Sequence, residues 1–213
     1  MLDLALAAFV NFVVIIDPIG VVPFFIGHTS QLDPAQRRAT ALKSVVIAAV
    51  VLLIFTIVGQ PLLHYLGVPV AAFRIAGGIL LLLLAVDMVL VKESGIRATT
   101  RAEEEETSHR PDVAVFPLAI PLIAGPGAIA SVILLQSQNA GSLGNQAVVA
   151  GVMLAVLALT GLSFLLASRI MRVLGVTGIN VMTRVLGIIL AALAVSNVIE
   201  GLRASFPVLG PAA

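Results

Sequence analysis

The sequence predicts an all-α, polytopic membrane protein with six transmembrane helices, arranged as two inverted three-helix repeats. The first observation behind this prediction is composition. Of the 213 residues, 60% are hydrophobic and only 11% are charged, and the mean hydropathy is +1.14. A soluble domain is nearer half apolar and a quarter charged. The apolar residues also fall into blocks of roughly 20, enough to cross a hydrocarbon core of ~30 Å. Finally, landmarks of the first half recur in the second half.

The apolar blocks set the expected spans. Those of the first half are 4–27, 42–63 and 70–91, and those of the second half are 113–135, 147–167 and 181–202. A polar connector at 92–112 contains the acidic run 103–106 and separates a first repeat, 1–91, from a second, 113–213. Both repeats belong to one membrane domain. The first block has no basic leader and is too long for a signal peptide, so we expect it to remain as a helix.

The basic residues predict the orientation, because cytoplasmic loops are enriched in Lys and Arg. With the N-terminus outside, the outer side holds only Arg74 and Arg203. The cytoplasmic side then holds all the others, namely Arg37, Arg38, Lys43, Lys92, Arg97, Arg101, Arg110, Arg169, Arg172 and Arg184. This bias predicts that both termini lie outside.

The repeat rests on four landmarks in the same order. Residues 15–20 recur in outline as 122–127, which aligns Pro18 with Pro126 at an offset of 108. Three further matches, 66–68 with 174–176, 74–77 with 184–187, and 84–86 with 193–195, have offsets of 108 to 110. Because each half has an odd number of spans, the halves must face opposite ways. Such inverted repeats are common among secondary transporters.

The first and fourth spans each contain a proline- and glycine-rich break. The first has Asp-Pro-Ile-Gly at 17–20, and the fourth has Gly-Pro-Gly at 125–127. Proline removes a backbone donor and clashes with the preceding turn, but it suits the first position of a new helix. We therefore expect both spans to be discontinuous, with helices restarting at Pro18 and Pro126. A restarting helix directs free N–H groups at whatever precedes it, which favours an anion. The alternative is a pair of proline kinks that only help packing.

Asp17 is the acidic residue deepest in a span. A carboxylate inside the membrane costs several kcal/mol unless it is paired, so a functional role is the first hypothesis. The alternative is an N-cap of the helix that restarts at Pro18. The residue aligned with it is Gly125, so the predicted site is acidic on one side only. The candidate substrate-binding residues are Asp17, Pro18, Gly20, Pro23, Gly125, Pro126 and Gly127.

Other polar groups lie nearer the span ends. Asp87 with Arg184, on the cytoplasmic side, and Arg74 with Glu200, on the outer side, are candidate gating pairs, with interfacial anchoring as the alternative. Hydroxyl groups within the spans are expected mainly to donate to backbone carbonyls; they belong to Thr56, Ser131, Thr160, Ser163 and Ser196. The chain has no Cys, and its three His lack ligand spacing. No metal, cofactor, catalytic residue or nucleic-acid partner is therefore expected.

The length, the six spans and the two motifs resemble the MarC family. The motifs are Asp-Pro-Ile-Gly-Val-Val-Pro-Phe-Phe at 17–25 and Pro-Leu-Ile-Ala-Gly-Pro-Gly-Ala-Ile at 121–129, and the similarity covers essentially the whole chain. The family is often labelled as neutral amino-acid transporters. This resemblance implies a protein of the cytoplasmic membrane of bacteria or archaea that carries small neutral amino acids.

The expected function is secondary transport of a small solute, because no Walker-type phosphate loop supports direct ATP hydrolysis. A proton or sodium ion is the expected coupling partner, with Asp17 as its acidic group, and membrane lipid surrounds the chain. A homo-oligomer remains open. One alternative is an intramembrane enzyme, although no paired deep aspartates, His-Glu-x-x-His or Gly-x-Ser-x-Gly motif is present. The other is a structural or regulatory membrane protein.

Overall fold

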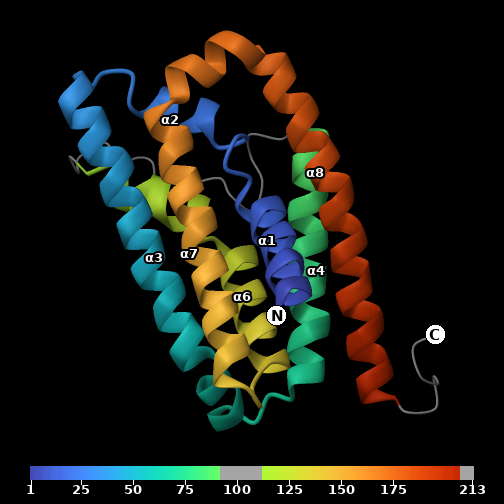
Figure 1. Cartoon of the computed structure of the whole chain (residues 1–213). Helices are drawn as coiled ribbons and strands as arrows, with labels where there is room; N and C mark the ends of the chain where they lie inside the picture. The colour runs from blue at the N-terminus through green and yellow to red at the C-terminus, as the bar shows by residue number, and fades with distance from the viewer. Residues whose placement is uncertain (92–111, 207–213) are drawn as a thin grey trace.

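The chain forms a bundle of helices in the computed structural model, which describes residues 1–91 and 112–206 and contains no strand within them (Figure 1). The acidic connector, apart from Asp112, lies outside the described residues. The elements in chain order are α1 (Leu2–Ile16), α2 (Val22–His28), α3 (Pro34–Tyr65), α4 (Val70–Leu90), η1 (Ala114–Ile123), α6 (Pro126–Gln138), α7 (Leu143–Leu165) and α8 (Ala167–Ser205).

Four helices, α3, α4, α7 and α8, are long and apolar enough to cross a membrane. The bent pair η1 and α6 adds a fifth span if it is counted as one. The 15 residues of α1 reach only ~22 Å at 1.5 Å per residue, which is short of a ~30 Å hydrocarbon core. An all-helical membrane protein is therefore confirmed, whereas six spans and the inverted repeat remain predictions.

Two helices start where their sequence offers a capping side chain. The Asp33 carboxylate accepts hydrogen bonds of 2.8 Å from the backbone N–H groups of Ala35 and Gln36, and Gln36 Oε1 accepts one of 3.2 Å from the Asp33 N–H. This capping box begins α3 well before the apolar block at 42–63. In the same way, the Ser142 hydroxyl caps the N-terminus of α7.

Helix α8 begins earlier than the span expected at 181–202. It follows α7 almost directly and arches over one end of the bundle before it descends (Figure 1). The bend is at Gly175, whose φ of 64° lies in the left-handed region that glycine adopts without steric cost. The chain therefore changes direction between two helical segments that meet at Gly175, whose backbone is not helical.

Apolar side chains cover both the inside and the outside of the bundle. Phe12, Leu52 and Met153 are fully buried, whereas Ile57 on α3 is 73% exposed and Ile188 on α8 is 63% exposed. Helices that are apolar all round are typical of a lipid environment, because water would disfavour such an outer surface.

Helices α4 and α8 lie side by side over most of their length (Figure 1). Glycine allows this approach. A Cβ added at Gly78 of α4 would lie 2.8 Å from the carbonyl oxygen of Ala194, and one added at Gly187 of α8 would lie 3.1 Å from that of Ala85. The contacts are reciprocal: Gly78 contacts Ala194 and Val198, and Gly187 contacts Ala85 and Val89. Each residue of the first set lies 109 positions from its counterpart in the second, as Gly78 does from Gly187.

Candidate functional site

The first break separates α1 from α2 and differs from the prediction. Helix α1 ends at Ile16, and Asp17 takes the left-handed conformation at its C-terminus, with φ 51° and ψ 66°. A turn follows, and α2 begins only at Val22, with Pro23 in its first turn. The predicted helix restart at Pro18 and the N-cap role of Asp17 are therefore wrong.

The local chemistry explains this difference. Asp17 Oδ1 accepts a 3.0 Å hydrogen bond from the Gly20 N–H, and the Asp17 carbonyl accepts one of 3.1 Å from the Val21 N–H. A short polar side chain that bonds its own backbone tolerates the left-handed region. An N-cap also accepts an N–H from two or three residues ahead, so sequence alone did not separate a helix end from a helix start.

The Asp17 carboxylate is buried, with 1% of the residue exposed. Its second oxygen, Oδ2, accepts a 2.9 Å hydrogen bond from the Thr183 hydroxyl on α8. A Cβ at Gly20 would overlap both the Asp17 carboxylate and the Thr183 hydroxyl, so glycine is required for this arrangement. Pro18 is buried beside it, and Pro23 is half-buried. A buried carboxylate thus sits at the interruption of one helix and is held by another.

The second break follows η1, an irregular helix with two extended residues. Phe116 has φ −133° and ψ 127°, and Ile120 has φ −131° and ψ 125°. Each precedes a proline, and a following proline disfavours the α region and pushes a residue toward extended geometry. Proline therefore interrupts the fourth span at two further points within the span expected at 113–135.

Helix α6 restarts at Pro126, as predicted, after a bend of 54°. Gly125 is its N-cap and provides no side-chain hydrogen bond. A Cβ at Gly125 would lie 2.5 Å from the carbonyl oxygen of Pro121, which the backbone cannot readily move. The N-terminus of α6 is therefore flanked by glycines, and its N-cap residue has no side chain to cover the backbone N–H groups.

The fold brings the two breaks together. A Cβ at Gly127 would lie 3.7 Å from Cγ2 of Ile15, two residues before Asp17, and 3.1 Å from Cδ2 of Leu84. A small cavity of about 10 Å³ occupies this place, lined by Ile15, Leu84, Leu122, Ile123, Gly125, Pro126, Gly127 and Ala128. Asp17 does not line it. Since a single water needs about 10–15 Å³, the space between the breaks is closed to anything larger than a water.

Most hydroxyl groups in the helices behave as predicted. The hydroxyls of Thr56, Thr160 and Ser163 donate to carbonyls four residues earlier in their own helices. Ser131 on α6 differs, because its hydroxyl donates to Oδ1 of Asn11 on α1. Together with Thr183, Asn11 is a polar residue near the breaks that the sequence did not identify. Neither Asn11 nor Thr183 belongs to a recognisable sequence motif, and their hydrogen-bond partners are evident only from the fold.

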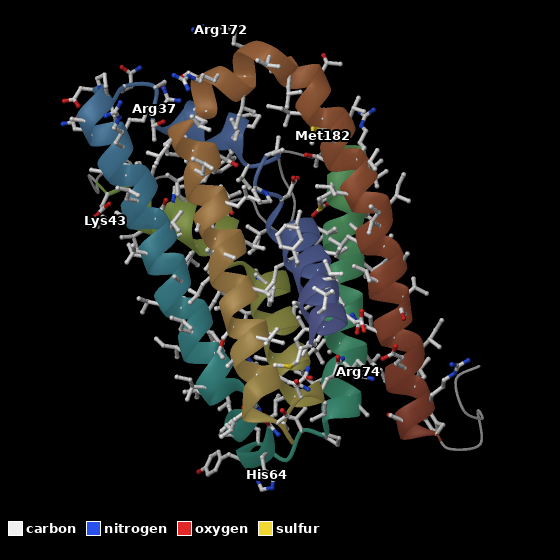
Figure 2. The ribbon with its side chains drawn as sticks, viewed as in Figure 1. Arg37, Lys43, His64, Arg74, Arg172 and Met182 are labelled. Atoms are coloured by element: carbon white, nitrogen blue, oxygen red, sulfur yellow. The ribbon has the colours of Figure 1, made fainter. Side chains whose placement is uncertain are left out.

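Of the two proposed charge pairs, one is formed. Arg74 Nη1 lies 2.8 Å from Glu200 Oε2, joining α4 to α8. Arg74 and His64 lie at one end of the bundle, and Arg37 and Arg172 lie at the other (Figure 2). A further ion pair joins Lys43 of α3 to Asp112. Arg184 is exposed, Asp87 is half-buried, and the gating role of all four residues stays a prediction.

Comparison with known proteins gives one consistent result. Residues 2–206 match the model of the MarC family integral membrane protein. A UPF0056 membrane protein of Bacillus subtilis, YvbG, is 36% identical over 98% of this chain and 99% of its own length. The Escherichia coli protein YhcE is 36% identical over 93% of this chain and 92% of its own, and an Archaeoglobus fulgidus relative is 38% identical over 92% and 91%. No solved structure matches the chain.

Proposed function

Because the chain belongs to the MarC family of integral membrane proteins, we propose that it is a secondary transporter of a small solute. Small neutral amino acids are the first solute class to test, and the cytoplasmic membrane of a prokaryote is the proposed location. One observation carries the proposal. The Asp17 carboxylate is buried at a helix break. The second break, where the N-cap Gly125 has no side chain to cover the helix start, lies against the same segment of α1. Ionisable groups and interrupted helices at membrane depth are typical of solute pathways.

The packing of the helices supports two inverted repeats. If the halves are exchanged, α1 and α2 correspond to η1 and α6, α3 corresponds to α7, and α4 corresponds to α8. The contact of α1 with α7 then corresponds to the contacts of η1 and α6 with α3. The contact of α4 with α6 corresponds to the contacts of α8 with α1 and α2. Each contact is the counterpart of the other when the halves are exchanged. The reciprocal glycine contacts of α4 and α8, all related by 109 residues, follow the same exchange. Inverted repeats allow alternating access by rocking of one half against the other around a fixed site.

In the proposed site, the solute binds between Asp17–Gly20 and Gly125–Gly127. A zwitterionic amino acid brings a carboxylate and an ammonium group, and both need partners in the membrane. The N-terminus of α6 offers backbone N–H groups to the carboxylate. Asp17 receives the ammonium group, or a coupling proton or sodium ion, after Thr183 yields one carboxylate oxygen.

This binding mode requires the helices to move apart. The cavity between the breaks measures about 10 Å³, enough for about one water. The Arg74–Glu200 ion pair holds α4 against α8 at one end of the bundle and is the proposed gate there. Asp87 and Arg184 are the proposed counterparts toward the other end. The proposed orientation places both termini outside, because the basic residues are concentrated on the opposite side.

Flux measurements test the function. Purified protein in proteoliposomes is expected to take up radiolabelled alanine, serine or glycine when a proton or sodium gradient is imposed, and protein-free liposomes are not. Folded protein that gives no uptake of these solutes under either gradient would overturn the amino-acid assignment.

The orientation has its own test, since the chain has no native Cys. An impermeant thiol reagent should label Ala212→Cys and not Ala102→Cys in intact cells, and the reverse labelling contradicts the topology.

A further inference from the structure

A second cavity lies away from the helix breaks, at the end of the bundle that carries Arg37 and Arg172 (Figure 2). Its volume is about 240 Å³. The start of α3, the end of α7 and the start of α8 meet there. The residues that line it are Leu32, Pro34, Arg37, Arg38, Phe164, Leu165 and Ser168.

Aromatic rings hold one of its two arginines in place. The Arg37 guanidinium carbon lies 5.4 Å from the centroid of the Phe25 ring, a distance at which cation and ring attract. Phe25 in turn stacks on Phe164, with ring centroids 4.3 Å apart and an angle of 8° between the rings. Arg37 Nη2 is nevertheless buried without a hydrogen-bond partner among the described residues. A buried donor in this state costs free energy until an acceptor binds it.

Asp33, the acidic residue one turn before Arg37, does not neutralise this pocket. The Asp33 carboxylate, one turn before Arg37, accepts the N–H groups of Ala35 and Gln36 as the cap of α3. Among the described residues it forms no ion pair with Arg37 or Arg38. Two guanidinium groups and the Ser168 hydroxyl therefore line a cavity in which no carboxylate of residues 1–91 and 112–206 pairs with the arginines.

We propose that this cavity binds a phosphate anion. Guanidinium forks match the oxygens of phosphate in two-point contacts, and the hydroxyl adds another donor. At about 240 Å³ the cavity is below the roughly 300–1,000 Å³ of pockets that hold drug-sized ligands, so it fits a headgroup-sized anion. It lies where the polar start of α3 meets the apolar end of α7, and with both helices spanning a membrane we expect this end at the level of lipid headgroups. An anionic lipid headgroup and free inorganic phosphate share this chemistry.

Thermal unfolding of the purified protein in detergent tests this proposal without a transport assay. The probes are short-chain dihexanoyl phosphatidylglycerol, dihexanoyl phosphatidylcholine and inorganic phosphate. We expect phosphatidylglycerol to raise the unfolding midpoint more than phosphatidylcholine. Arg37→Gln with Arg38→Gln should weaken the apparent affinity by about tenfold or more, because both forks are lost. Arg172→Gln, on the same end of the bundle and outside the cavity, should change the affinity less than about twofold.

The outcomes separate the sources of phosphate. An arginine-dependent rise with inorganic phosphate alone identifies the free ion, and a rise only with phosphatidylglycerol identifies the lipid headgroup. The proposal is overturned if neither probe raises the midpoint, or if the double Gln variant keeps the full affinity. Should that variant fail to fold, Arg37→Lys with Arg38→Lys keeps both charges and removes the forks. Wild-type affinity in the folded Lys variant also overturns the proposal.

Discussion

The two helix breaks occupy matching places in the sequence and are built from different chemistry. At the first break, α1 ends in a buried carboxylate that accepts hydrogen bonds from Gly20 and from Thr183 on another helix. At the second, α6 starts at Pro126 after Gly125, and the leucine side chains of α4 lie against Gly127. The first break is therefore polar and held by directed bonds, whereas the second is apolar and held by packing.

This difference teaches that two interrupted helices at matching places in the sequence do not require matching side chains. Both halves contain an interrupted helix, but only the first carries a charge at the interruption. A solute with one cationic and one anionic end needs unlike partners, and the two breaks are unlike in this sense. The comparison also predicts that substitutions that disturb the directed bonds of the first break cost more than substitutions that only add volume at the second.

The largest expected effect comes from Asp17→Asn, which removes the charge and keeps the size of the side chain. If Asp17 binds the solute or the coupling ion, uptake of the labelled amino acid should fall at least about tenfold, a loss of about 1.4 kcal/mol or more. The measurement is proteoliposome uptake by variant protein that elutes as the wild type does in size-exclusion chromatography. Wild-type uptake by this folded variant would remove Asp17 from the mechanism.

Gly20→Ala is expected to have the next largest effect, this time on stability. The added Cβ overlaps the Asp17 carboxylate and the Thr183 hydroxyl, so the turn must shift and the directed bonds lengthen. Overpacking of this kind costs about 1–3 kcal/mol in free energy of unfolding. The matched control is Gly27→Ala in α2, where the new Cβ has no neighbour within 4 Å and the change favours the helix by up to about 1 kcal/mol. Equal effects of the two substitutions would contradict the close packing at the first break.

Thr183→Val tests whether the first break is held by a directed bond. The change keeps the shape of the side chain and leaves Asp17 Oδ2 without its hydroxyl donor, which should cost about 1–3 kcal/mol in free energy of unfolding. Thr160→Val is the control, because the Thr160 hydroxyl donates only to the Val156 carbonyl in its own helix. That bond supplements the helix and is not needed to satisfy a charge, so its loss should cost under about 1 kcal/mol. A Thr183 variant as stable as the Thr160 variant argues against the bond.

The smallest effect is expected at the second break, for Gly127→Ala. Its Cβ would lie 3.1 Å from Cδ2 of Leu84 and 3.3 Å from Cδ2 of Leu81, the far ends of flexible side chains that turn aside easily. We expect a cost below about 1 kcal/mol in free energy of unfolding. Gly151→Ala, on α7 with no neighbour within 4 Å, gives the baseline. The contrast between the breaks fails if Gly127→Ala costs as much as Gly20→Ala.

Sequence patterns predicted the fold class and one of the two restarts. Blocks of apolar residues identified the long helices, and Gly125-Pro126 identified the start of α6, because glycine and proline both suit a helix start. The prediction of a helix restart at Pro18 was wrong, because an Asp that accepts a nearby backbone N–H can lie at the C-terminus of a helix as well as at its N-terminus. Gly175, between the expected spans, does have non-helical backbone angles, but the sequence did not predict the helical segment that precedes it.

The partners of Asp17 were beyond prediction from the sequence. Thr183 lies 166 residues away, in a segment where a threonine ordinarily bonds its own backbone. Asn11 and Ser131 are likewise joined only by the packing of α1 on α6. Local signals locate a helix break, whereas the side chains that complete a site come from the tertiary fold.

The reciprocal glycines of α4 and α8 also bear on how such a chain could arise. Gly78 meets Ala194 and Val198, and Gly187 meets Ala85 and Val89, so one patch is used twice within a single polypeptide. This is the self-complementary geometry of a twofold homodimer interface. Two copies of one three-helix unit, inserted into a bilayer in opposite directions, would form the same contact. In such an ancestor each substitution would act on both sides of the interface at once. Joining such copies into one chain would free the two sides to change separately, so that one break could carry a carboxylate and the other glycine.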